Sequence, residues 1–404
     1  MYFTPLLPNN LDSRMDEELL KMSETLCLKS AALGAGYPIQ VRNGIKNMLR
    51  VINSYYSNMI ESEGTHPFEI EKASRKIFSE DLKHQRLQKL SLVHIEVQKW
   101  IEDRLKESDD SIIFTRQFIQ DVHRKFYSHE DMESFLHIPT VPESTDPSTT
   151  IKMIPGEFRD RLVYVGGHEA PDHTLISSLF NIYESGYKIY PRFMQSTKVI
   201  YAIASHHRLS WIHPFLDGNG RTSRLVLDGI FAGIGLEGYG MWNISRGLAR
   251  SSSEYKKHLS IADWPRQGDR DGRGPLSLEG LKIYIRFMLQ TAIDQVEYME
   301  SVLQLQTLGD RIEKYVEFSR AGMYNTEPLP KHSDLLLKAL LIKGEVARGD
   351  VKSIINASIS TATKLIKELV DRDFLESDTP KGAIRIKFNA HFASVIFPGL
   401  ISGS

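Results

Sequence analysis

Twelve consecutive residues, His213 to Arg224 (HPFLDGNGRTSR), hold side chains and glycines suited to binding and moving a phosphate group. The stretch Gly218-Asn219-Gly220 allows backbone conformations that are closed to β-branched residues. Successive N–H groups can then converge on one anion, and the helix predicted to follow turns its positive end toward it. The sequence therefore predicts an anion-binding loop at the start of a helix.

Four charged or titratable side chains surround this loop in the sequence. Arg221 and Arg224 are three apart in the first turns of the predicted helix, so both can lean toward the same anion. Asp217 offers oxygen to a hard cation such as Mg²⁺. His213 ends the preceding predicted helix, where a neutral imidazole can take a proton from an attacking hydroxyl. A glycine-rich turn or a capping histidine is common by itself, but the combination indicates phosphoryl or nucleotidyl transfer.

The same residues match in full the motif HxFx[D/E]GNGRxxR, and over about residues 90–305 the chain resembles the Fic (filamentation induced by cAMP) family. The segment PGEFR at 155–159 is similar to that family's lead-in to a flap hairpin. The resemblance implies a helical enzyme that transfers AMP from ATP to a serine, threonine or tyrosine hydroxyl of a target protein. Family members that use ATP as a phosphate donor carry lysine in place of Gly220, so the intact loop favours AMP transfer.

The resemblance also implies a role for each position of the motif. His213 would be the general base, Phe215 would anchor the loop in the core, and Asp217 would bind the Mg²⁺ that bridges the α- and β-phosphates. Arg224 would grip the γ-phosphate. The remaining phosphate contacts would come from Gly218, Asn219, Gly220 and Arg221. The flap that pins the target chain by strand pairing would be Leu162, Val163, Tyr164 and Val165.

The nucleoside would lie against a stretch that resembles the family's nucleoside contacts at Tyr255, Leu259 and Asp263. The usual residue at the last of these positions is asparagine, so Asp263 departs from the family at the point that reads the base. Ordinary helix packing is the alternative interpretation for Tyr255 and Leu259.

An earlier segment resembles the inhibitory helix that many relatives carry, with the pattern [S/T]xxxE[G/N]. Ser57 and Glu61 supply its first and fifth positions, but Ser62 replaces the glycine or asparagine. Glu63 followed by glycine matches the last two positions of the pattern, but Met59 then occupies the first position, where serine or threonine is expected. We therefore favour Glu61. Glu61 would pair with the Arg224 guanidinium and force ATP into an unproductive pose. A solvated glutamate at a helix end is the alternative.

Most of the chain has the apolar spacing of amphipathic helices. The predicted helices cover 45–62, 90–105, 115–127, 173–189, 196–212, 220–233 and 277–305, the last with Ser277 as N-cap. Residues 159–165 instead predict a β-hairpin that turns at Gly166-Gly167. Residues 138–154, rich in proline, serine and threonine, predict a surface loop.

The division of the chain follows from these patterns. We expect an N-terminal helical region at 1–89 with the inhibitory helix at about 44–62, a catalytic domain at 90–320 and a linker at 321–332. Residues 333–404 have helices at 334–342, 349–355 and 358–371 and then two short strands, which is the order of a winged helix. The fold class is therefore mainly α, with a β-hairpin flap and a C-terminal winged helix.

Composition limits the partners and the compartment. The 404 residues carry 50 Lys and Arg against 51 Asp and Glu, so the whole-chain charge does not indicate a nucleic-acid or membrane binder. A single cysteine, Cys27, excludes an intramolecular disulfide, and the first ten residues do not read as a signal peptide. We expect a cytoplasmic protein with no membrane partner. The winged helix could contact DNA or a protein, and a homodimer stays open.

The sequence favours a protein adenylyltransferase that uses ATP and Mg²⁺ and is inhibited by its own Glu61. Two other enzyme activities stay open on the same fold, namely transfer of another phosphate-linked group and removal of AMP. The competing class is a DNA-binding regulator whose Fic-like domain only senses nucleotide.

Overall fold

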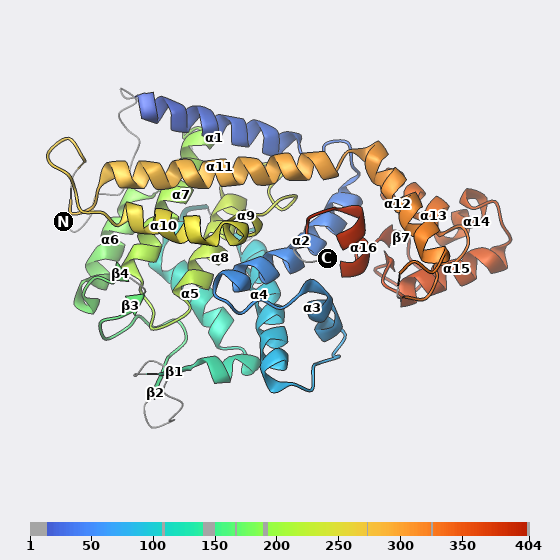
Figure 1. The fold of residues 1–404 in the computed structure, drawn as a ribbon, viewed down its shortest axis with the longest axis horizontal. Helices are drawn as coiled ribbons and strands as arrows, with labels where there is room; N and C mark the ends of the chain where they lie inside the picture. Colours follow the sequence, from blue (N-terminus) through green and yellow to red (C-terminus); the bar gives the residue numbers. More distant parts are fainter. Residues whose placement is uncertain are drawn as a thin grey trace.

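The computed structural model describes residues 14–106, 110–139, 150–165, 168–188, 193–272, 274–324 and 326–401. This part of the protein is mainly helical, with two two-stranded and one three-stranded antiparallel sheets (Figure 1). The helices before the motif are α1 Arg14–Ala32, α2 Ile39–Ile60, α3 Pro67–Ser74, α4 Leu82–Lys106, α5 Arg116–Tyr127, α6 Ile176–Gly186 and α7 Gln195–Ile212. Those after it are α8 Asn219–Gly233, α9 Ile244–Arg250, α10 Ser252–Ala262, α11 Leu278–Val302 and α12 Leu305–Arg320.

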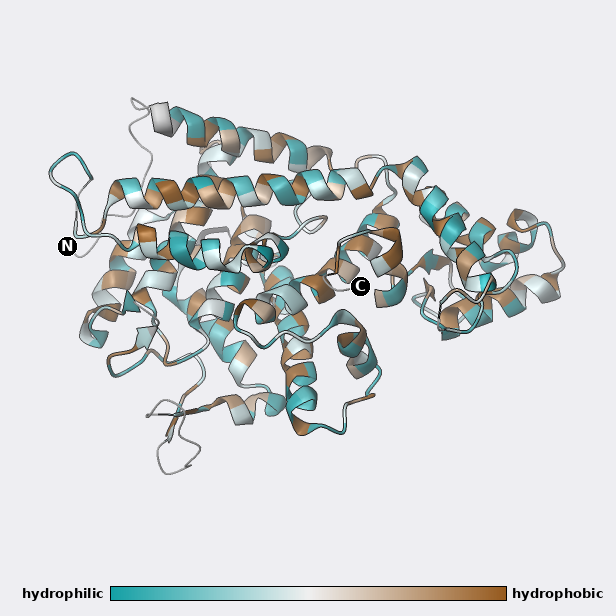
Figure 2. Cartoon of the chain, in the orientation of Figure 1, coloured by the Kyte–Doolittle hydropathy of each residue, from teal (hydrophilic) through white to brown (hydrophobic). Residues whose placement is uncertain are grey.

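Helix α8, which begins inside the motif, lies at the centre of the helical body. It packs against α4, α5 and α7 and also touches α2. The long helix α11 runs beside α1 along one side of the body, with α10 against its other flank (Figure 1). Apolar and polar residues alternate along α11 as an amphipathic helix requires (Figure 2). The motif is therefore mounted on a buried helix rather than on a free loop.

The predicted helices are confirmed. Each predicted window contains an observed helix, and the Ser277 hydroxyl caps α11 by accepting the Gly280 N–H at 2.9 Å. The sequence missed α12, which continues the chain almost without a break after α11. None of the helices in the described ranges is at once long and apolar enough to cross a lipid bilayer.

Two stretches of extended chain stand out from the helices. The predicted hairpin is confirmed but short, because β3 (Tyr164–Val165) pairs only with β4 (His168–Glu169), and the expected Gly166-Gly167 turn lies outside the described residues. The surface loop predicted for 138–154 is wrong at both ends. There β1 (His137–Pro139) pairs antiparallel with β2 (Thr150–Lys152), since backbone pairing stabilises these ends despite their loop-like composition.

The C-terminal elements follow the order helix, strand, two helices and two strands. They are α13 Ser333–Lys343, β5 Glu345–Val346, α14 Val351–Ile354, α15 Ile359–Asp371, β6 Leu375–Glu376 and β7 Ile384–Ile386. The sheet order is β5-β7-β6, and the Ser358 hydroxyl caps α15 by accepting the Thr361 N–H at 3.1 Å. A last helix, α16 (Ala390–Ile396), which the sequence did not predict, returns toward the body (Figure 1).

The chain after β7 is bound to helix α2 and its neighbours. The Tyr56 hydroxyl on α2 donates to the Leu400 carbonyl at 2.9 Å, and the Arg246 guanidinium donates to the Gly399 carbonyl at 2.6 Å. A Cβ at Gly44 would lie 3.2 Å from the Ile386 carbonyl, so α2 and β7 approach closely. The C-terminal end and the first third of the chain thus share one packed interface.

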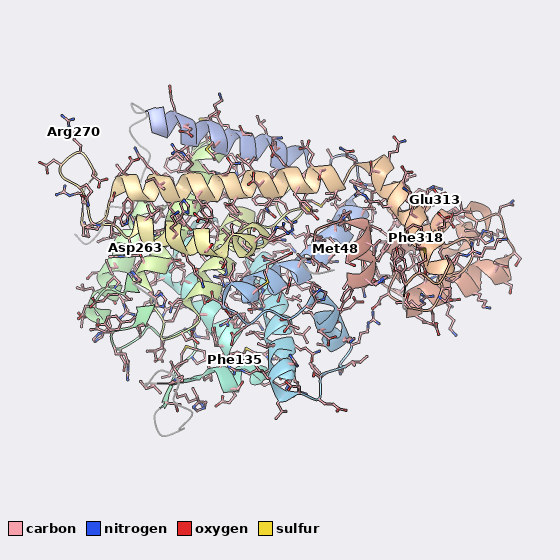
Figure 3. The ribbon with its side chains drawn as sticks, viewed as in Figure 1. Met48, Phe135, Asp263, Arg270, Glu313 and Phe318 are labelled. Atoms are coloured by element: carbon pink, nitrogen blue, oxygen red, sulfur yellow. The ribbon has the colours of Figure 1, made fainter. Side chains whose placement is uncertain are left out.

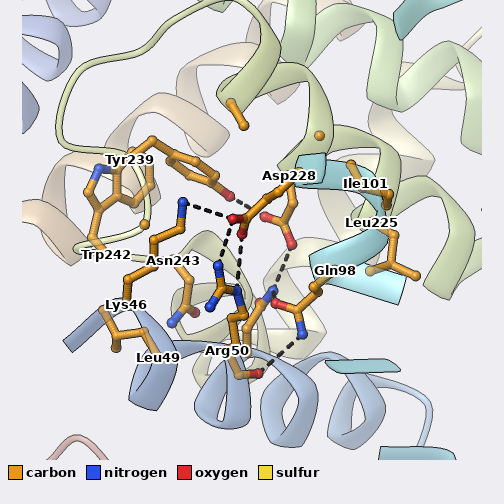
Figure 4. A pocket seen from close by; sticks show the side chains of 15 residues that line it. Lys46, Leu49, Arg50, Gln98, Ile101, Leu225, Asp228, Tyr239, Trp242 and Asn243 are labelled. Atoms are coloured by element: carbon orange, nitrogen blue, oxygen red, sulfur yellow. Dashed lines mark hydrogen bonds and ion pairs between the residues drawn. The ribbon is translucent and has the colours of Figure 1, made fainter. Parts of the chain in front are cut away.

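A polar cluster joins α2, α4 and α8 around a small cavity of about 50 Å³ (Figure 4). On the α2 side, the Asn53 amide donates to the Asp228 carboxylate of α8 at 2.7 Å. Arg50 of the same helix donates to both oxygens of Glu102 on α4, at 3.2 and 2.6 Å. The Tyr239 hydroxyl also donates to Asp228. These bonds fix the position of α2 against the helix that carries the motif.

We predict that Asp228→Asn raises the stability of the protein relative to wild type, and that this gain is larger at neutral pH than at acid pH. Burial raises the pKa of Asp228 to about 6 from its ordinary 3.8. Ionised Asp228 therefore costs stability, a cost that grows as pH rises from about 4 to about 6 and is constant above. The difference in melting temperature, variant minus wild type, should rise across that window and then level off. A difference that is the same at pH 4 and pH 8 would contradict the shift.

Candidate active site

The loop between α7 and α8 is held in shape by its own asparagine. Asn219 accepts the Phe215 N–H at 2.9 Å and donates to the Phe215 carbonyl at 2.8 Å, which closes the loop on itself. Phe215 is buried and stacks on the His123 ring, with ring centres 3.8 Å apart. The Asn219 side chain is thus used within the loop, and its backbone N–H is left for an anion.

Gly218 lies where the chain admits only a glycine. Its φ of +74° is in the left-handed region, and a Cβ there would overlap the Tyr127 hydroxyl. His213 is also left-handed, with φ 48°, and it ends α7 with its N–H bonded to the Leu209 carbonyl at 3.1 Å. These two turns place the His213 imidazole and the start of α8 on the same cleft.

His213 is neutral at physiological pH. Burial lowers the pKa of His213 to about 4, and the nearby His168 acts in the same direction. A neutral imidazole can accept a proton, which a protonated one cannot. His213 therefore has the charge state that a general base requires.

Both arginines of the motif are buried and paired with groups from the end of α2. The Arg224 guanidinium donates from Nε to the Ser57 hydroxyl at 3.0 Å and from Nη2 to Glu61 Oε1 at 2.7 Å. Arg221 donates to the Asn58 side chain at 3.2 Å and pairs with Glu63. The structure thus brings the sequence-predicted Ser57 and Glu61 onto Arg224.

The charges of this cluster stabilise one another. Partial burial works against ionisation of Glu61, but Arg224 and Arg221 outweigh it and hold the pKa of Glu61 below its usual range. Gly220 lies beside the carboxylate, and a Cβ there would overlap Glu61 Oε1. Any larger residue at 220 would therefore displace the glutamate from the arginines.

Ser62 shows why the inhibitory pattern prefers glycine or asparagine after the glutamate. Its φ is +61°, so it is in the left-handed region that ends many helices. The Ser62 N–H bonds to the Met59 carbonyl and the Glu63 N–H to the Asn58 carbonyl, each at 2.9 Å. Serine costs about 1 kcal/mol more than glycine in this conformation, and the turn it makes carries Glu63 to Arg221.

Asp217 is the carboxylate that could hold a cation. It is exposed and lines the cleft, and its Oδ1 accepts the Gly218 N–H at 2.7 Å. Within the described ranges no three His, Cys, Asp or Glu side chains lie close enough together to hold a metal. One carboxylate at an anion-binding loop fits Mg²⁺, which takes most of its ligands from phosphates and water.

The cleft has a volume of about 1460 Å³ and is lined by most of the predicted site residues, though not by Ser57, which lies behind it on Arg224. Along one wall lie Tyr255, Leu259 and Asp263 of α10 and its C-terminal end, where Figure 3 labels Asp263. Tyr255 is buried, with its hydroxyl 2.9 Å from His206 Nε2. Tyr255 therefore both packs against the neighbouring helices and lines the cleft.

The flap forms the opposite lip of the cleft. Leu162 and Tyr164 are exposed, by 45% and 67%, and Val163 also lines the cleft, whereas nothing is described of the Val165 side chain. The buried Arg159 connects the flap to the motif. It donates to the His213 carbonyl at 2.8 Å and to the Arg161 carbonyl at 2.7 Å.

Sequence reasoning missed several residues that shape this site. In the sequence Arg159 stands out only as the end of PGEFR, and the spacing of Glu63 fits the inhibitory pattern poorly. Tyr127, whose hydroxyl accepts from Arg221 at 3.1 Å, gave no signal beyond the apolar face of its helix. These contacts join residues 54 to 158 positions apart in the chain, which spacing along one segment cannot show.

Comparison with known proteins finds a family to which part of this chain is similar. Residues 114–230 match the Fic/DOC family. The protein adenylyltransferase Fic of Aedes aegypti is 35% identical over 130 residues, which are 32% of this chain and 21% of that protein. The chain thus covers about a fifth of that relative's length.

Two solved structures share the fold. A Fic family protein from Desulfovibrio desulfuricans G20 superposes with a TM-score of 0.51 at 15% identity, over 96% of this chain and 98% of that one. Fic-1 (residues 134–508) from C. elegans gives 0.52 at 17% identity, over 73% and 74%. The first match extends to the C-terminal elements, so the mainly helical fold with small antiparallel sheets is shared along almost the whole chain.

We predict that Ser62→Gly stabilises the protein by about 1 kcal/mol, because glycine adopts the left-handed conformation without the Cβ penalty. Denaturant unfolding monitored by circular dichroism would measure the gain. Ser62→Ala is the matched control, since alanine keeps the penalty and should show no gain. Equal stability of the two variants would mean that the turn is unstrained.

Proposed function

We propose, from the premise that the chain carries a Fic/DOC family domain at residues 114–230, that this protein transfers AMP from ATP to a hydroxyl of a target protein. The observation that carries the proposal is the closed loop from His213 to Arg224, which brings a neutral imidazole and two buried guanidinium groups onto one cleft. The adenylyltransferase name of the matched relatives points the same way.

The chemistry follows from the residues around the loop. The target hydroxyl would attack the α-phosphorus while His213 takes its proton, and pyrophosphate would leave with the electrons of the broken P–O bond. The N–H groups at the start of α8 and the two arginines would bind the phosphates. Asp217 would hold Mg²⁺, which when bound neutralises phosphate charge.

The proposal that the group transferred is AMP, and not phosphate, rests on Gly220. This position has no room for a side chain next to Glu61, whereas the kinase-like members of the family carry lysine there. An intact glycine leaves the phosphates of ATP free to enter along the start of α8. The γ-phosphate would then meet Arg224 and the α-phosphate would lie nearer His213.

We further propose that Glu61 inhibits the enzyme. Arg224 cannot bind a γ-phosphate while it is bonded to Glu61 Oε1 and the Ser57 hydroxyl. ATP would then bind with its α-phosphate turned away from the attacking hydroxyl. Glu63 adds a second carboxylate on Arg221, so both arginines are occupied from the end of one helix. Since Glu61 and Arg224 belong to the same chain here, the inhibition needs no neighbouring molecule.

The division of the chain into 1–89, 90–320, a linker at 321–332 and a winged helix at 333–404 also belongs to this proposal. The exposed start of α15, with Ser360, Thr361 and Lys364, has the placement of a recognition helix. Residues 333–388 hold ten Lys and Arg against eight Asp and Glu, which gives little phosphate neutralisation. Contacts with a protein, including a second copy of the chain, fit this balance as well as contacts with DNA.

We predict that Glu61→Gly raises self-labelling from α-labelled ATP several-fold over wild type, because Arg224 becomes free for the γ-phosphate. The measurement is incorporation of α-labelled and of γ-labelled ATP, with Mg²⁺, by purified protein and in a lysate. Glu61→Gly combined with His213→Ala should incorporate neither. Glu63→Gly should raise labelling by less than Glu61→Gly, since it frees only Arg221.

Each alternative has its own result in this experiment. Label from the γ-phosphate would indicate a kinase-like reaction. No label from either nucleotide would favour transfer of another phosphate-linked group, removal of AMP, or a nucleotide-sensing regulator. Equal labelling by wild type and Glu61→Gly would leave the transferase in place and remove the inhibition.

We predict that any binding of duplex DNA by the full chain is weak at about 50 mM salt and falls only about tenfold by about 200 mM, because few phosphates can be neutralised. A gel shift at both concentrations measures it. Lys364→Glu on the exposed face of α15 should abolish the shift, whereas Lys29→Glu on α1 should not. No shift at the lower salt would leave a protein as the partner.

A further inference from the structure

His168, on strand β4 of the flap, lies between two hydrogen-bond acceptors. Its Nδ1 is 3.2 Å from a carboxylate oxygen of Asp263, and its Nε2 is 3.0 Å from the Trp211 carbonyl. Neither acceptor can donate, because one is a carbonyl and the other is a carboxylate. Both imidazole nitrogens must therefore carry hydrogen for both bonds to form, which makes His168 an imidazolium cation.

The second oxygen of Asp263 faces another histidine. His207 Nε2 lies 3.0 Å from Asp263 Oδ1 and 3.1 Å from the Leu259 carbonyl, so this nitrogen is a donor. Its other nitrogen faces the Arg208 guanidinium at 3.1 Å and must accept, so His207 is neutral. Asp263 is thus an ionised carboxylate with one charged and one neutral histidine.

The surroundings of His168 agree with its positive charge. Burial and the positive Arg159 oppose it, but Asp263 outweighs them and raises the pKa of His168 above 6.5. The same two histidines hold the pKa of Asp263 well below its usual range, against the effect of its own burial. The charged and titratable groups around His168 are Asp263 at the end of α10, His207 and Arg208 on α7, His213 after α7, and Arg159 before the flap.

The His168 side chain connects three parts of the site. Its strand β4 pairs with β3, which carries the exposed Tyr164 of the flap. The Trp211 carbonyl lies at the end of α7, two residues before His213. Asp263, labelled in Figure 3, follows the last residue of α10, which lines the cleft.

We propose that His168 is a positioning residue, and that the His168–Asp263 pair is a latch that holds the flap over His213 only while His168 is protonated. The inference rests on the proposed function for the meaning of the flap, whereas the latch itself rests on the contacts. Loss of the proton would remove one of the two donors and the ion pair, so β4 would keep at most one side-chain hydrogen bond to the body.

The latch also explains Asp263, the position where the sequence departs from the family. Both carboxylate oxygens are occupied by histidines, so Asp263 serves the flap rather than the base of the nucleotide. An asparagine at 263 could accept from only one histidine through its single carbonyl oxygen, and it could not balance the charge of His168.

The charge of His168 acts on the proposed base as well. The two rings lie 6.4 Å apart, and the positive charge helps burial to keep His213 deprotonated. His168 thus sets the upper pH limit of activity and His213 sets the lower one. The latch is closed below the raised pKa of His168, and His213 is a base above about 4. Turnover of a target is expected between these limits and should decline as His168 deprotonates.

The first test needs no catalysis. In NMR spectra of the full chain, His168 should titrate above 6.5, and Asp263→Asn should lower that pKa by at least one unit. Hydrogen exchange of residues 160–165 and 168–170, corrected for intrinsic rates, should be slower at pH 6 than at pH 8.5. In His168→Gln the exchange of these residues should be fast and the same at both pH values. His84→Gln, at an exposed position on α4, is the matched control.

The second test uses turnover in the Glu61→Gly background. His168→Gln should raise KM for the protein target about tenfold or more with a smaller change in KM for ATP, because misplacement of the bound chain alone can cost up to about a hundredfold. The alkaline limb of the pH profile should also disappear. A His168 that titrates at or below 6.5, or flap exchange that is independent of pH in wild type, would overturn the latch. Absence of AMP transfer with a normal titration would instead count against the proposed function.

Discussion

The ion pair between Arg224 and Glu61 is the interaction on which the rest of the site depends. Arg224 is 2% exposed, and a buried guanidinium without a partner is costly. The end of α2 supplies that partner, the carboxylate of Glu61. A γ-phosphate would offer the same charge at the same place. Under the proposed function, inhibition and substrate binding would be two ways to meet one electrostatic requirement.

This requirement explains why α2 is held from so many sides. Asn53 bonds to Asp228 on the motif helix, Arg50 bonds to Glu102 on α4, and Tyr56 bonds to the Leu400 carbonyl. A carboxylate that partners a buried arginine must be held within hydrogen-bonding distance of it, so its helix must not slide. The C-terminal end of the chain is part of this support, which links elements more than 300 residues apart in sequence.

The sequence was sufficient for most of the long helices, though not for α12 or α16, for the loop from His213 to Arg224 and for the pairing of Glu61 with Arg224. These features depend on local periodicity, on glycines at fixed offsets and on a resemblance carried by contiguous residues. It was not sufficient for Glu63, Arg159 or His168. Each of these acts through a partner brought near by the fold, on Arg221, on the His213 carbonyl and on Asp263. The sequence does not predict the strands at 137–139 and 150–152 for the same reason, since each forms only by pairing with the other segment.

The departures from the family pattern turn out to be connected to these tertiary contacts. Ser62 takes a left-handed conformation that glycine would adopt more easily, and the next residue reaches Arg221. Asp263 replaces an amide with a carboxylate, and that charge is matched by a histidine on the flap. A substitution that is unfavourable by local rules can persist when a partner elsewhere compensates for it. In this chain the compensating partners lie in the cleft, where the end of α2 and the β3–β4 hairpin meet the motif.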